Sequence, residues 1–398
     1  MFNNLINAVG SQVPQFFLDF GMFKGKEKEH VYVVGNGWAS YYFVKYLDKS
    51  KFKPIIIAPN SQVLNTPKLV NRVINPNEIV EFPNPYAEII TDMVEDINLP
   101  NKVLITKSGH QIPYNRVVLA IGSEPNDFGI PGVSEHTYKF KSIQDADLLR
   151  TKLNSLYTTS QIYIVGAGVT GIELATNISK MKIFDGFKGI GIKMIDGLDM
   201  ILPGYNSNTK EHIYKEITSG YPNLEIKLNC LINLINLEPN KSFELKYFDK
   251  NIGQTKSYWL NWNPKFESDI VVWTGGVRFC GYGKSKLFKT LYQISPIKPR
   301  GIEVNENFSL EGQNNSIFCL GDMVANQGPP SAQNAKNQGI WLAQYFNSGF
   351  DINYTKSNPY KITSKGKLVH LGDKIWLESE FYSGYIVKFI DRIIEWIE

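Results

Sequence analysis

One repeated pattern constrains the fold of this chain more than any other feature of its sequence. An apolar segment at residues 31–34 precedes a glycine-rich turn, a helix-forming stretch and a second apolar segment at 54–57. The same order returns between apolar segments at 161–165 and 191–196, and the two turns begin 131 residues apart. Such a strand–turn–helix–strand unit is typical of the start of a parallel α/β sheet. We therefore predict an α/β fold with two Rossmann-like dinucleotide-binding domains.

The first glycine-rich turn contains Gly35 and Gly37, and Ser40 stands where a third glycine usually packs the helix on its strand. Glycines at such a turn let backbone N–H groups approach a pyrophosphate at the positive end of the helix. The acid that usually binds the adenosine ribose would fall near Ala58, which cannot accept a hydrogen bond from its side chain. The polar residues 60–61 are alternatives for this role, as is binding through the backbone alone.

The second turn is complete, with Gly166, Gly168 and Gly171, and Asp196 ends the strand that follows its helix. A carboxylate at this position accepts a hydrogen bond from the ribose 2′-OH and repels a 2′-phosphate. This predicts a preference for NADH over NADPH. The alternative is that Asp196 serves only as a turn residue at the end of a strand.

Two further strand ends carry glycines. The segment VVLAIG ends at Gly122, and IFCLGD ends at Gly321 and Asp322. An aspartate placed between a strand and a helix can accept a hydrogen bond from a ribityl hydroxyl, while the helix N-terminus faces the flavin phosphate. A hydride donor in one domain and a redox ring in the other predict hydride transfer to a flavin.

Composition excludes several other classes. The 398 residues carry a net charge of only +4, which does not favour a nucleic-acid partner, and no run of apolar residues is long enough to span a bilayer. Three cysteines and five scattered histidines provide neither a disulfide framework nor metal-ligand spacing. The first 23 residues contain no Lys or Arg, so no signal or transit peptide is evident. We expect a metal-free protein of a reducing, intracellular compartment.

Longer motifs show a resemblance to one family of proteins. In order along the chain, the matching stretches are GNGWAS (35–40), LAIGSEPN (119–126), GIPGVSEH (129–136), GAGVTGIELA (166–175), LPGY (202–205), VVWTGGVR (271–278), CLGD (319–322), GPPSAQNAKNQG (328–339) and HLGDK (370–374). Over residues 30–375 the chain resembles the two-dinucleotide-binding-domain flavoproteins. Within that superfamily it resembles the type II NADH:quinone oxidoreductases, which are single-subunit NADH dehydrogenases.

The resemblance implies roles for individual residues. The residues implied for FAD are Gly35, Gly37, Thr66, Pro67, Gly122, Gly321 and Asp322, and those for NADH are Gly166, Gly168, Gly171 and Asp196. Glu173 would lie close to the nicotinamide, although a purely structural acid near a helix N-terminus is an equal alternative. Ala332, Gln333 and Gln338 match a segment that lines a quinone pocket, but Asn337 replaces a glutamine of that motif.

The function implied is an FAD-dependent NADH dehydrogenase that passes electrons to a quinone without pumping protons, with Glu173, Gln333 and Gln338 near the reacting rings. Thioredoxin-, glutathione- and sulfide-type reductases need reactive cysteines, and the sequence shows no cysteine pair. Drift at Ser40, Ala58 and Asn337 leaves an alternative open, namely a catalytically idle flavoprotein scaffold or a soluble diaphorase.

The expected organisation is an N-terminal arm (1–30), an FAD-binding domain (31–145 and 280–345), an NADH-binding domain (146–279) and a C-terminal segment (346–398). In that last segment apolar residues recur at helical spacing at Ile386, Phe389, Ile390, Ile393, Ile394 and Ile397. This amphipathic stretch favours peripheral membrane contact. Packing on the protein's own surface, or on a second subunit of a homodimer, is the alternative.

Overall fold

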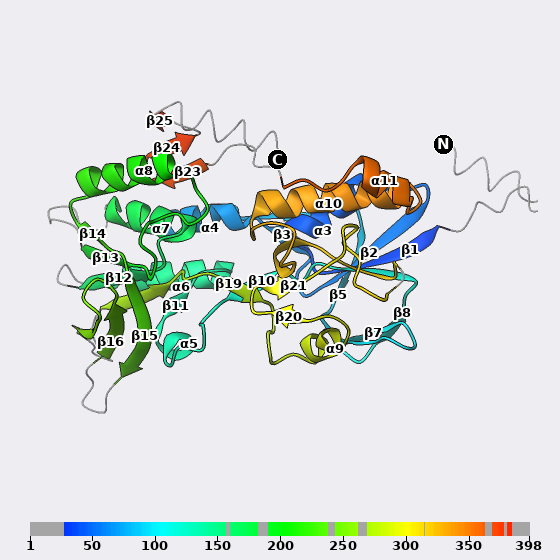
Figure 1. Cartoon of the computed structure of the whole chain (residues 1–398), viewed down its shortest axis with the longest axis horizontal. Helices are drawn as coiled ribbons and strands as arrows, with labels where there is room; N and C mark the ends of the chain where they lie inside the picture. The colour runs from blue at the N-terminus through cyan, green and yellow to red at the C-terminus, as the bar shows by residue number, and fades with distance from the viewer. Residues whose placement is uncertain are drawn as a thin grey trace, which may run out of the picture.

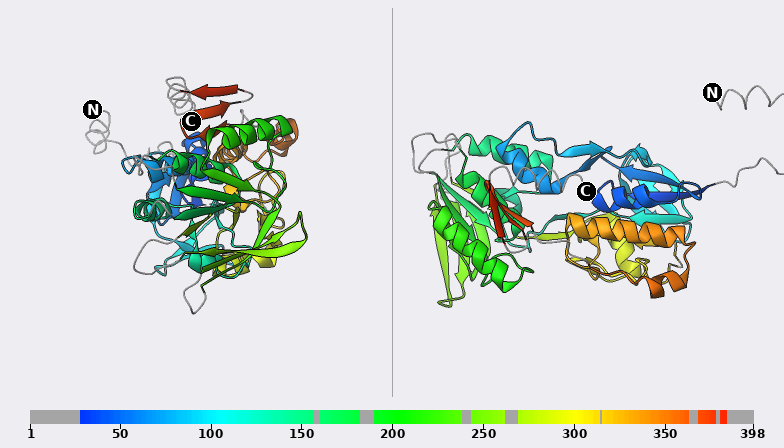
Figure 2. Two further views of the ribbon diagram at one scale, coloured as in Figure 1. Left: turned by 90° about the vertical axis from the view of Figure 1, so that its left-hand side faces the viewer. Right: turned by 90° about the horizontal axis from the view of Figure 1, so that it is seen from above.

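The computed structural model describes residues 28–156, 160–181, 190–237, 243–261, 269–313, 315–362, 368–377 and 380–383. Two lobes lie side by side and are joined by a pair of short strands (Figures 1 and 2). These strands, β10 (Ser123–Pro125) and β19 (Val277–Phe279), run antiparallel to each other. The chain first reaches the second lobe with α4 (Leu69–Ile74) and returns with β4 (Glu81–Pro83), which pairs with β3 (Gln62–Leu64). It leaves the first lobe again through β10 and returns to it through β19.

The first lobe is built on a five-stranded parallel sheet in the order β22-β9-β1-β2-β5. Its strands are β1 (Glu29–Val34), β2 (Phe52–Ala58), β5 (Glu88–Thr91), β9 (Arg116–Leu119) and β22 (Ile317–Cys319). Figure 1 shows α3 (Trp38–Tyr46) and α10 (Ala332–Asn347) above this sheet, and β7 (Val103–Thr106) and α9 (Lys286–Ile294) below it. The apolar run of β1 is buried because both faces of a parallel sheet are covered.

Smaller elements complete this lobe. They are β3 (Gln62–Leu64), β4 (Glu81–Pro83), β6 (Val94–Asn98), β8 (Gln111–Pro113), β20 (Ile297–Lys298), β21 (Gly301–Ile302), η1 (Thr66–Lys68), η3 (Gly321–Met323) and α11 (Ile352–Ser357). Helix α10 lies close against α3 at Gly339, where a Cβ would lie 2.4 Å from the carbonyl oxygen of Ala39. Ser40, which replaces the third glycine of the first turn, is completely buried.

The second lobe has its own parallel sheet in the order β11-β18-β12-β13-β14. Its strands are β11 (Tyr138–Lys139), β12 (Gln161–Val165), β13 (Gly191–Ile195), β14 (Leu224–Lys227) and β18 (Ile270–Trp273). One face packs on helices α4 (Leu69–Ile74), α6 (Ile143–Leu153), α7 (Val169–Ser179) and α8 (Ser207–Gly220). The short helix α5 (Val133–His136) packs through Val133 in the core on the other face. An antiparallel sheet, β15 (Cys230–Leu237), β16 (Phe243–Asp249) and β17 (Gln254–Leu260), covers the other face.

Strand β12 shows how its sequence serves both layers. Ile162 and Ile164 belong to the core shared with the helices, whereas Tyr163 and Val165 belong to the core shared with the antiparallel sheet. Successive side chains of a strand point to opposite faces, so a continuous apolar run is needed here. The expected α/β fold with two parallel-sheet domains is confirmed.

Two features differ from the expected organisation. Because the chain crosses between lobes at β10, the expected domain boundary at residue 145 lies inside the second lobe, and β11 pairs with β18 there. The C-terminal segment is divided as well: α11 packs on the first lobe, while β23 (Leu368–Leu371), β24 (Lys374–Leu377) and β25 (Glu380–Ser383) form a small sheet on the second. The amphipathic stretch at 386–397 lies outside the described residues.

Candidate cofactor and active site

The first glycine turn joins β1 to α3 at the carboxyl edge of the first sheet. Gly35 has a φ of +104°, and a Cβ there would lie 2.3 Å from the carbonyl oxygen of Ala120. Gly37 is the N-cap residue of α3, where no side chain caps the helix and a Cβ would meet no atom within 4 Å. The first N–H groups of α3 therefore face open space, into which a phosphate can enter.

The second glycine turn repeats this geometry between β12 and α7. Gly166 has a φ of +110°, and a Cβ there would lie 2.5 Å from the carbonyl oxygen of Thr274. Gly168 is an N-cap residue without a side-chain cap and has open space around it. A Cβ on Gly171 would lie 2.0 Å from the carbonyl oxygen of Gly166, so this glycine permits the close contact of helix and turn. A tight turn, open space at the helix N-terminus and a close contact between helix and turn are the properties that the glycines of a dinucleotide-binding turn supply.

Asp196 lies directly beside this second turn. Its Oδ2 accepts a hydrogen bond from the backbone N–H of Ala167 at 2.6 Å, and its Oδ1 accepts one from Leu198 at 2.8 Å. These two bonds show that Asp196 fixes the turn, and its role toward a ribose stays a prediction.

Asp322 lies in η3, next to the end of β22. Its Oδ2 accepts a hydrogen bond from Ser123 Oγ at 2.8 Å and lies 3.2 Å from Lys141 Nζ. Gly122 and Gly321 flank this cluster with φ values of +74° and +76°. The hydrogen bond between Ser123 and Asp322, which are 199 residues apart in the sequence, thus joins the ends of two strands.

Thr66 and Pro67 begin the short helix η1 that follows β3. Pro67 is exposed and Thr66 is partly exposed, so both can face a ligand. The preceding residue, Asn65, has a buried side-chain oxygen, Oδ1, with no hydrogen-bond partner among the described residues. A buried acceptor of this kind is costly unless a donor reaches it, and a bound cofactor would supply one.

The loop after β2, where the adenosine ribose was expected, is held by amides that were not predicted from the sequence. Asn36, between the two glycines, donates from Nδ2 to the carbonyl oxygen of Ser61 at 3.1 Å and accepts from Asn84 Nδ2 at 3.0 Å. Ala58 is buried and exposes no acceptor. Asn36 therefore fixes the loop after β2 that the sequence left with two alternatives. The sequence feature that could have predicted this contact is the amide side chain of Asn36 between the two glycines.

Glu173 lies in the second turn of α7. Its Oε1 accepts a hydrogen bond from the backbone N–H of His370 in β23 at 3.1 Å. Removal from water raises the pKa of this carboxyl to about 7, and the bond from His370 opposes that rise. Glu173 in turn helps to raise the pKa of Tyr205 to about 12, after burial of that phenol. A carboxyl with a pKa near 7 can exchange a proton at neutral pH.

Helix α10 carries the residues expected near a quinone. Its N-cap residue Ser331 accepts a hydrogen bond from the N–H of Asn334, and Ala332 and Gln333 are partly exposed in the first turn. Gln333 has no hydrogen-bond partner among the described residues, so its amide is available.

Gln338, one and a half turns further along α10, differs from the expectation. It is completely buried; Oε1 accepts from the N–H of Gly321 at 2.6 Å, and Nε2 donates to the carbonyl oxygen of Gln327 at 3.0 Å. Because both ends of this amide are bound to the backbone, Gln338 positions η3 rather than presenting a group to the reacting rings.

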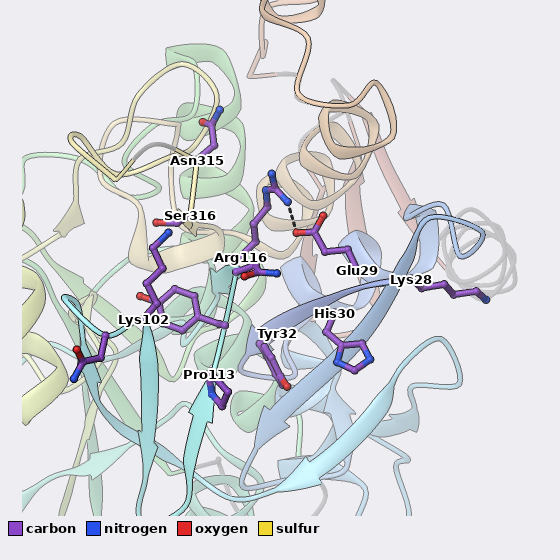
Figure 3. Close-up of a pocket in the computed structure, with 12 residues that line it drawn as sticks. Lys28, Glu29, His30, Tyr32, Lys102, Pro113, Arg116, Asn315 and Ser316 are labelled. Atoms are coloured by element: carbon purple, nitrogen blue, oxygen red, sulfur yellow. Dashed lines mark hydrogen bonds and ion pairs between the residues drawn. The ribbon is translucent and has the colours of Figure 1, made fainter. Parts of the chain in front are cut away.

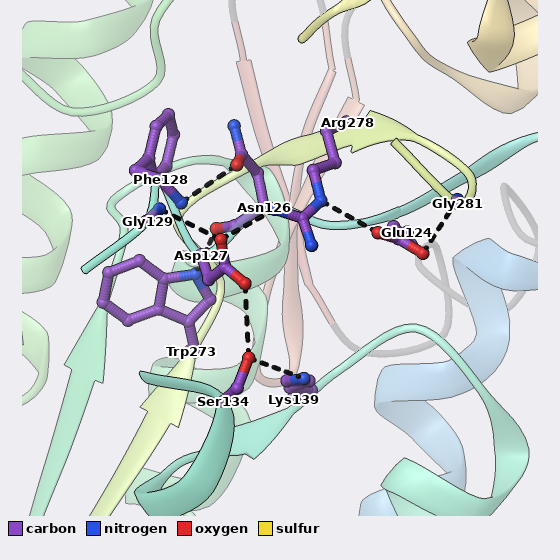
Figure 4. Close-up of polar contacts among 10 residues, drawn as sticks. All are labelled: Glu124, Asn126, Asp127, Phe128, Gly129, Ser134, Lys139, Trp273, Arg278 and Gly281. Carbon is purple, nitrogen blue, oxygen red and sulfur yellow. Dashed lines mark hydrogen bonds and ion pairs between the residues drawn. The ribbon is translucent and has the colours of Figure 1, made fainter. Parts of the chain in front are cut away.

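The bridge between the lobes is reinforced by charge. Arg278 in β19 lies 2.8 Å from Glu124 and 2.7 Å from Asp127, both on the outgoing strand segment (Figure 4). Trp273 donates from its indole N–H to the carbonyl oxygen of Asn126 at 2.7 Å. The Arg278 side chain is only 14% exposed, so these ion pairs are partly shielded from solvent. They tie the two crossing segments together.

A polar groove of about 1020 Å³ lies at the opposite edge of the first sheet (Figure 3). It is lined by Lys28, His30, Lys102 and Arg116, among other residues, at the amino ends of β1 and β9. Glu29 pairs with Arg116 there. Ligands of open parallel sheets bind at the carboxyl ends of the strands, so this groove is separate from the predicted site.

Comparison with known proteins decides the family. Residues 29–339, most of the chain, match the family described as pyridine nucleotide-disulphide oxidoreductase. The chain belongs to this family.

Individual relatives are more distant. External NADH-ubiquinone oxidoreductase 2 of Saccharomyces cerevisiae is 24% identical over 86% of this chain and 66% of its own length, and a probable NADH dehydrogenase of Dictyostelium discoideum is 25% identical over 90% and 83%. The solved structure of NDH2 from Plasmodium falciparum in complex with NADH aligns with a TM-score of 0.75 at 17% identity, over 93% and 94%. The chain spans about two thirds of the length of the yeast relative. These names agree with the resemblance predicted from the motifs.

This member of the pyridine nucleotide-disulphide oxidoreductase family has no disulfide among its three cysteines. Cys230 and Cys319 are buried, Cys280 is partly exposed, and all three are free. Burial raises the pKa of the Cys319 thiol well above its usual range. Reactive cysteines need a lowered pKa and access to substrate. Two observations support FAD and NADH as cofactors: the family match, and the two glycine turns of this protein, which are open and lack a side-chain cap.

Proposed function

We propose that this protein is an FAD-dependent NADH dehydrogenase that passes electrons from NADH to a quinone without pumping protons. One observation carries the proposal: two glycine turns with open, uncapped helix N-termini lie at the carboxyl edges of two parallel sheets that a short bridge holds together. One turn suits FAD and the other suits NADH. The names of the relatives supply the substrate class.

Each residue's part follows from its surroundings. When bound, FAD supplies the hydride-accepting ring. Gly168 and the N-terminus of α7 would hold the pyrophosphate of NADH, and Asp196 would orient its ribose. Asp322 would accept a hydrogen bond from the ribityl chain of FAD. Glu173, whose pKa is raised to about 7, can hold a proton close to the nicotinamide end of the same helix at neutral pH.

The acceptor side rests on α10. Gln333, whose amide has no partner in the described part of the chain, would hydrogen-bond a quinone carbonyl from the start of this helix. Gln338 would act by holding η3. The second candidate function is a diaphorase without a quinone. It is favoured by Gln338, whose amide is bonded to the backbone at both ends, and by Asn337, which stands in place of a glutamine. The two functions share the reduction of flavin by NADH and differ in whether a quinone reoxidises the flavin.

The test is an anaerobic absorbance titration of the purified protein. Bound flavin should be bleached by NADH, and a short-chain quinone should restore its absorbance within the turnover time. Bleaching without rapid recovery would support the diaphorase, and failure of NADH to bleach a bound flavin would support the idle scaffold. Absence of any releasable flavin would refute the proposal entirely.

We also propose peripheral membrane contact through the stretch at 386–397, on the strength of its amphipathic pattern. Among the described residues, no helix has the length and apolar character to cross a bilayer. Liposome flotation should carry the full chain, and a form ending at Ser383 should remain below. Equal behaviour of the two forms would refute contact through this stretch, and a loss of dimer in the shortened form would assign the stretch to a homodimer.

A further inference from the structure

Asp322 receives a contact that the sequence motifs do not predict. Lys141 Nζ lies 3.2 Å from its Oδ2, and Ser123 Oγ donates to the same oxygen at 2.8 Å. These three residues come from η3, from the loop between β11 and α6, and from β10. Asp322 Oδ1 has no hydrogen-bond partner among the described residues, so it is available to accept a ribityl hydroxyl.

Lys141 is fixed to the second lobe. Its backbone N–H donates to Asp145 Oδ2 at 2.9 Å, and the same carboxylate closes the capping box of α6 with Ser142. Helix α6 then packs through Ala146 and Leu149 into the core of that lobe. The ion pair therefore reaches from the second lobe to an acid of the first.

The environment makes this ion pair more than a surface contact. The side chains of Lys141 and Asp322 are 29% and 19% exposed. Lys141 is also close enough to the Cys280 thiol to oppose the rise of its pKa caused by burial and by Glu124. A partly shielded ion pair with a second donor holds a carboxylate in one orientation better than a solvated one.

We propose that Lys141 is a positioning residue, which holds Asp322 in the orientation that binds FAD and thereby couples FAD binding to the docking of the second lobe. This inference rests on FAD occupying the first glycine turn. Lys141 neutralises part of the negative charge on Asp322, and Ser123 prevents the carboxylate from rotating. The other oxygen of the carboxylate, Oδ1, is thereby already oriented to accept a hydrogen bond from a bound flavin.

The experiment measures FAD release from full-length holoprotein, followed by the rise in free-flavin fluorescence on dilution. Lys141→Met should raise the dissociation constant for FAD about tenfold or more, the usual effect of losing a charge-assisted hydrogen bond. Lys141→Arg should recover most of this affinity because it keeps the charge. Lys139→Met is the matched control, because Lys139 lies on the same segment and its ammonium group donates to the exposed Ser134 Oγ; its dissociation constant for FAD should equal that of the wild type.

A double-mutant cycle separates positioning from general destabilisation. If Lys141 acts through Asp322, then Lys141→Met should add little to the loss caused by Asp322→Asn. Additive losses would overturn the proposal, as would a Lys141→Met protein with wild-type affinity. A Lys141→Met protein whose melting temperature falls equally with and without added FAD would also overturn it. If the wild-type protein itself binds no FAD, the proposed function fails instead, before any variant is compared.

Discussion

The raised pKa of Glu173 gives a prediction about stability whose sign and size both follow from the structure. Burial raises this pKa from 4.5 to about 7. The folded protein therefore binds a proton that the unfolded chain has released, at every pH between these two values. Stability is lost as the pH rises through this window, and the loss is complete above about pH 7. A rise of this size corresponds to at most ~3 kcal/mol.

Glu173→Gln removes the charge but keeps an oxygen that can accept the N–H of His370. The new amide N–H₂ group costs about 1 kcal/mol where it lacks a partner. The variant should therefore be about 2 kcal/mol more stable than the wild type at pH 8, where the wild type has lost the ~3 kcal/mol, and about 1 kcal/mol less stable at pH 4.5, where only the cost of the amide remains. For a domain of this size the gain at pH 8 is roughly 4–8 °C in melting temperature.

The assay is thermal unfolding followed by circular dichroism at pH 4.5, 6, 7 and 8, with a fixed excess of FAD. Glu225→Gln is the matched control, because this carboxylate of β14 is 51% exposed and paired with Lys193. The control should show no gain at high pH. A Glu173→Gln curve that runs parallel to the wild-type curve at every pH would refute the reasoning.

Three further predictions concern separate parts of the site. Asp196→Ser should lower the ratio of kcat/KM for NADH to kcat/KM for NADPH, because the repulsion of a 2′-phosphate is lost. Steady-state kinetics with both nucleotides measure this ratio, and an unchanged ratio would contradict the assignment. Gln333→Leu should slow flavin reoxidation by quinone and leave reduction by NADH intact in stopped-flow absorbance; equal loss of both steps would place Gln333 at the flavin. Arg278→Lys keeps the charge but loses contact with one of its two partners, and chemical denaturation should show a loss of about 1–2 kcal/mol; an unchanged unfolding midpoint would mean that the bridge is held by other contacts.

The parts of the fold that local sequence determines were predictable. β12 was predicted at its observed bounds, because a sheet covered on both faces needs an unbroken apolar run. Gly35 and Gly166 were assigned to turns, and each has a positive φ and a close backbone neighbour that only glycine allows. An apolar run and a glycine-rich turn can each be recognised in a short stretch of sequence, even though the carbonyl oxygens that Gly35 and Gly166 approach belong to Ala120 and Thr274, far away in the chain.

The orientation of polar side chains was not predictable in the same way. Gln338 was placed near the reacting rings because of its motif, but its amide is held by the N–H of Gly321 and the carbonyl of Gln327. Which partner an amide finds depends on how α10 packs against η3, and no periodicity encodes that. The partner of Glu173 is a backbone N–H 197 residues away, which carries no signal in residue type.

The two acids of the site show why its halves are not independent. Asp322 in the first lobe is held by Lys141 of the second, and Glu173 in the second lobe is held by β23, which the chain forms only after completing α10 and α11 of the first. Val369, Leu371 and Trp376 of the small C-terminal sheet also belong to the buried core of the second lobe. Residues 146–279 alone would lack this cover, exposing apolar surface and leaving Glu173 without its donor. The second lobe therefore reaches its final form only when the chain has passed through the first lobe and returned.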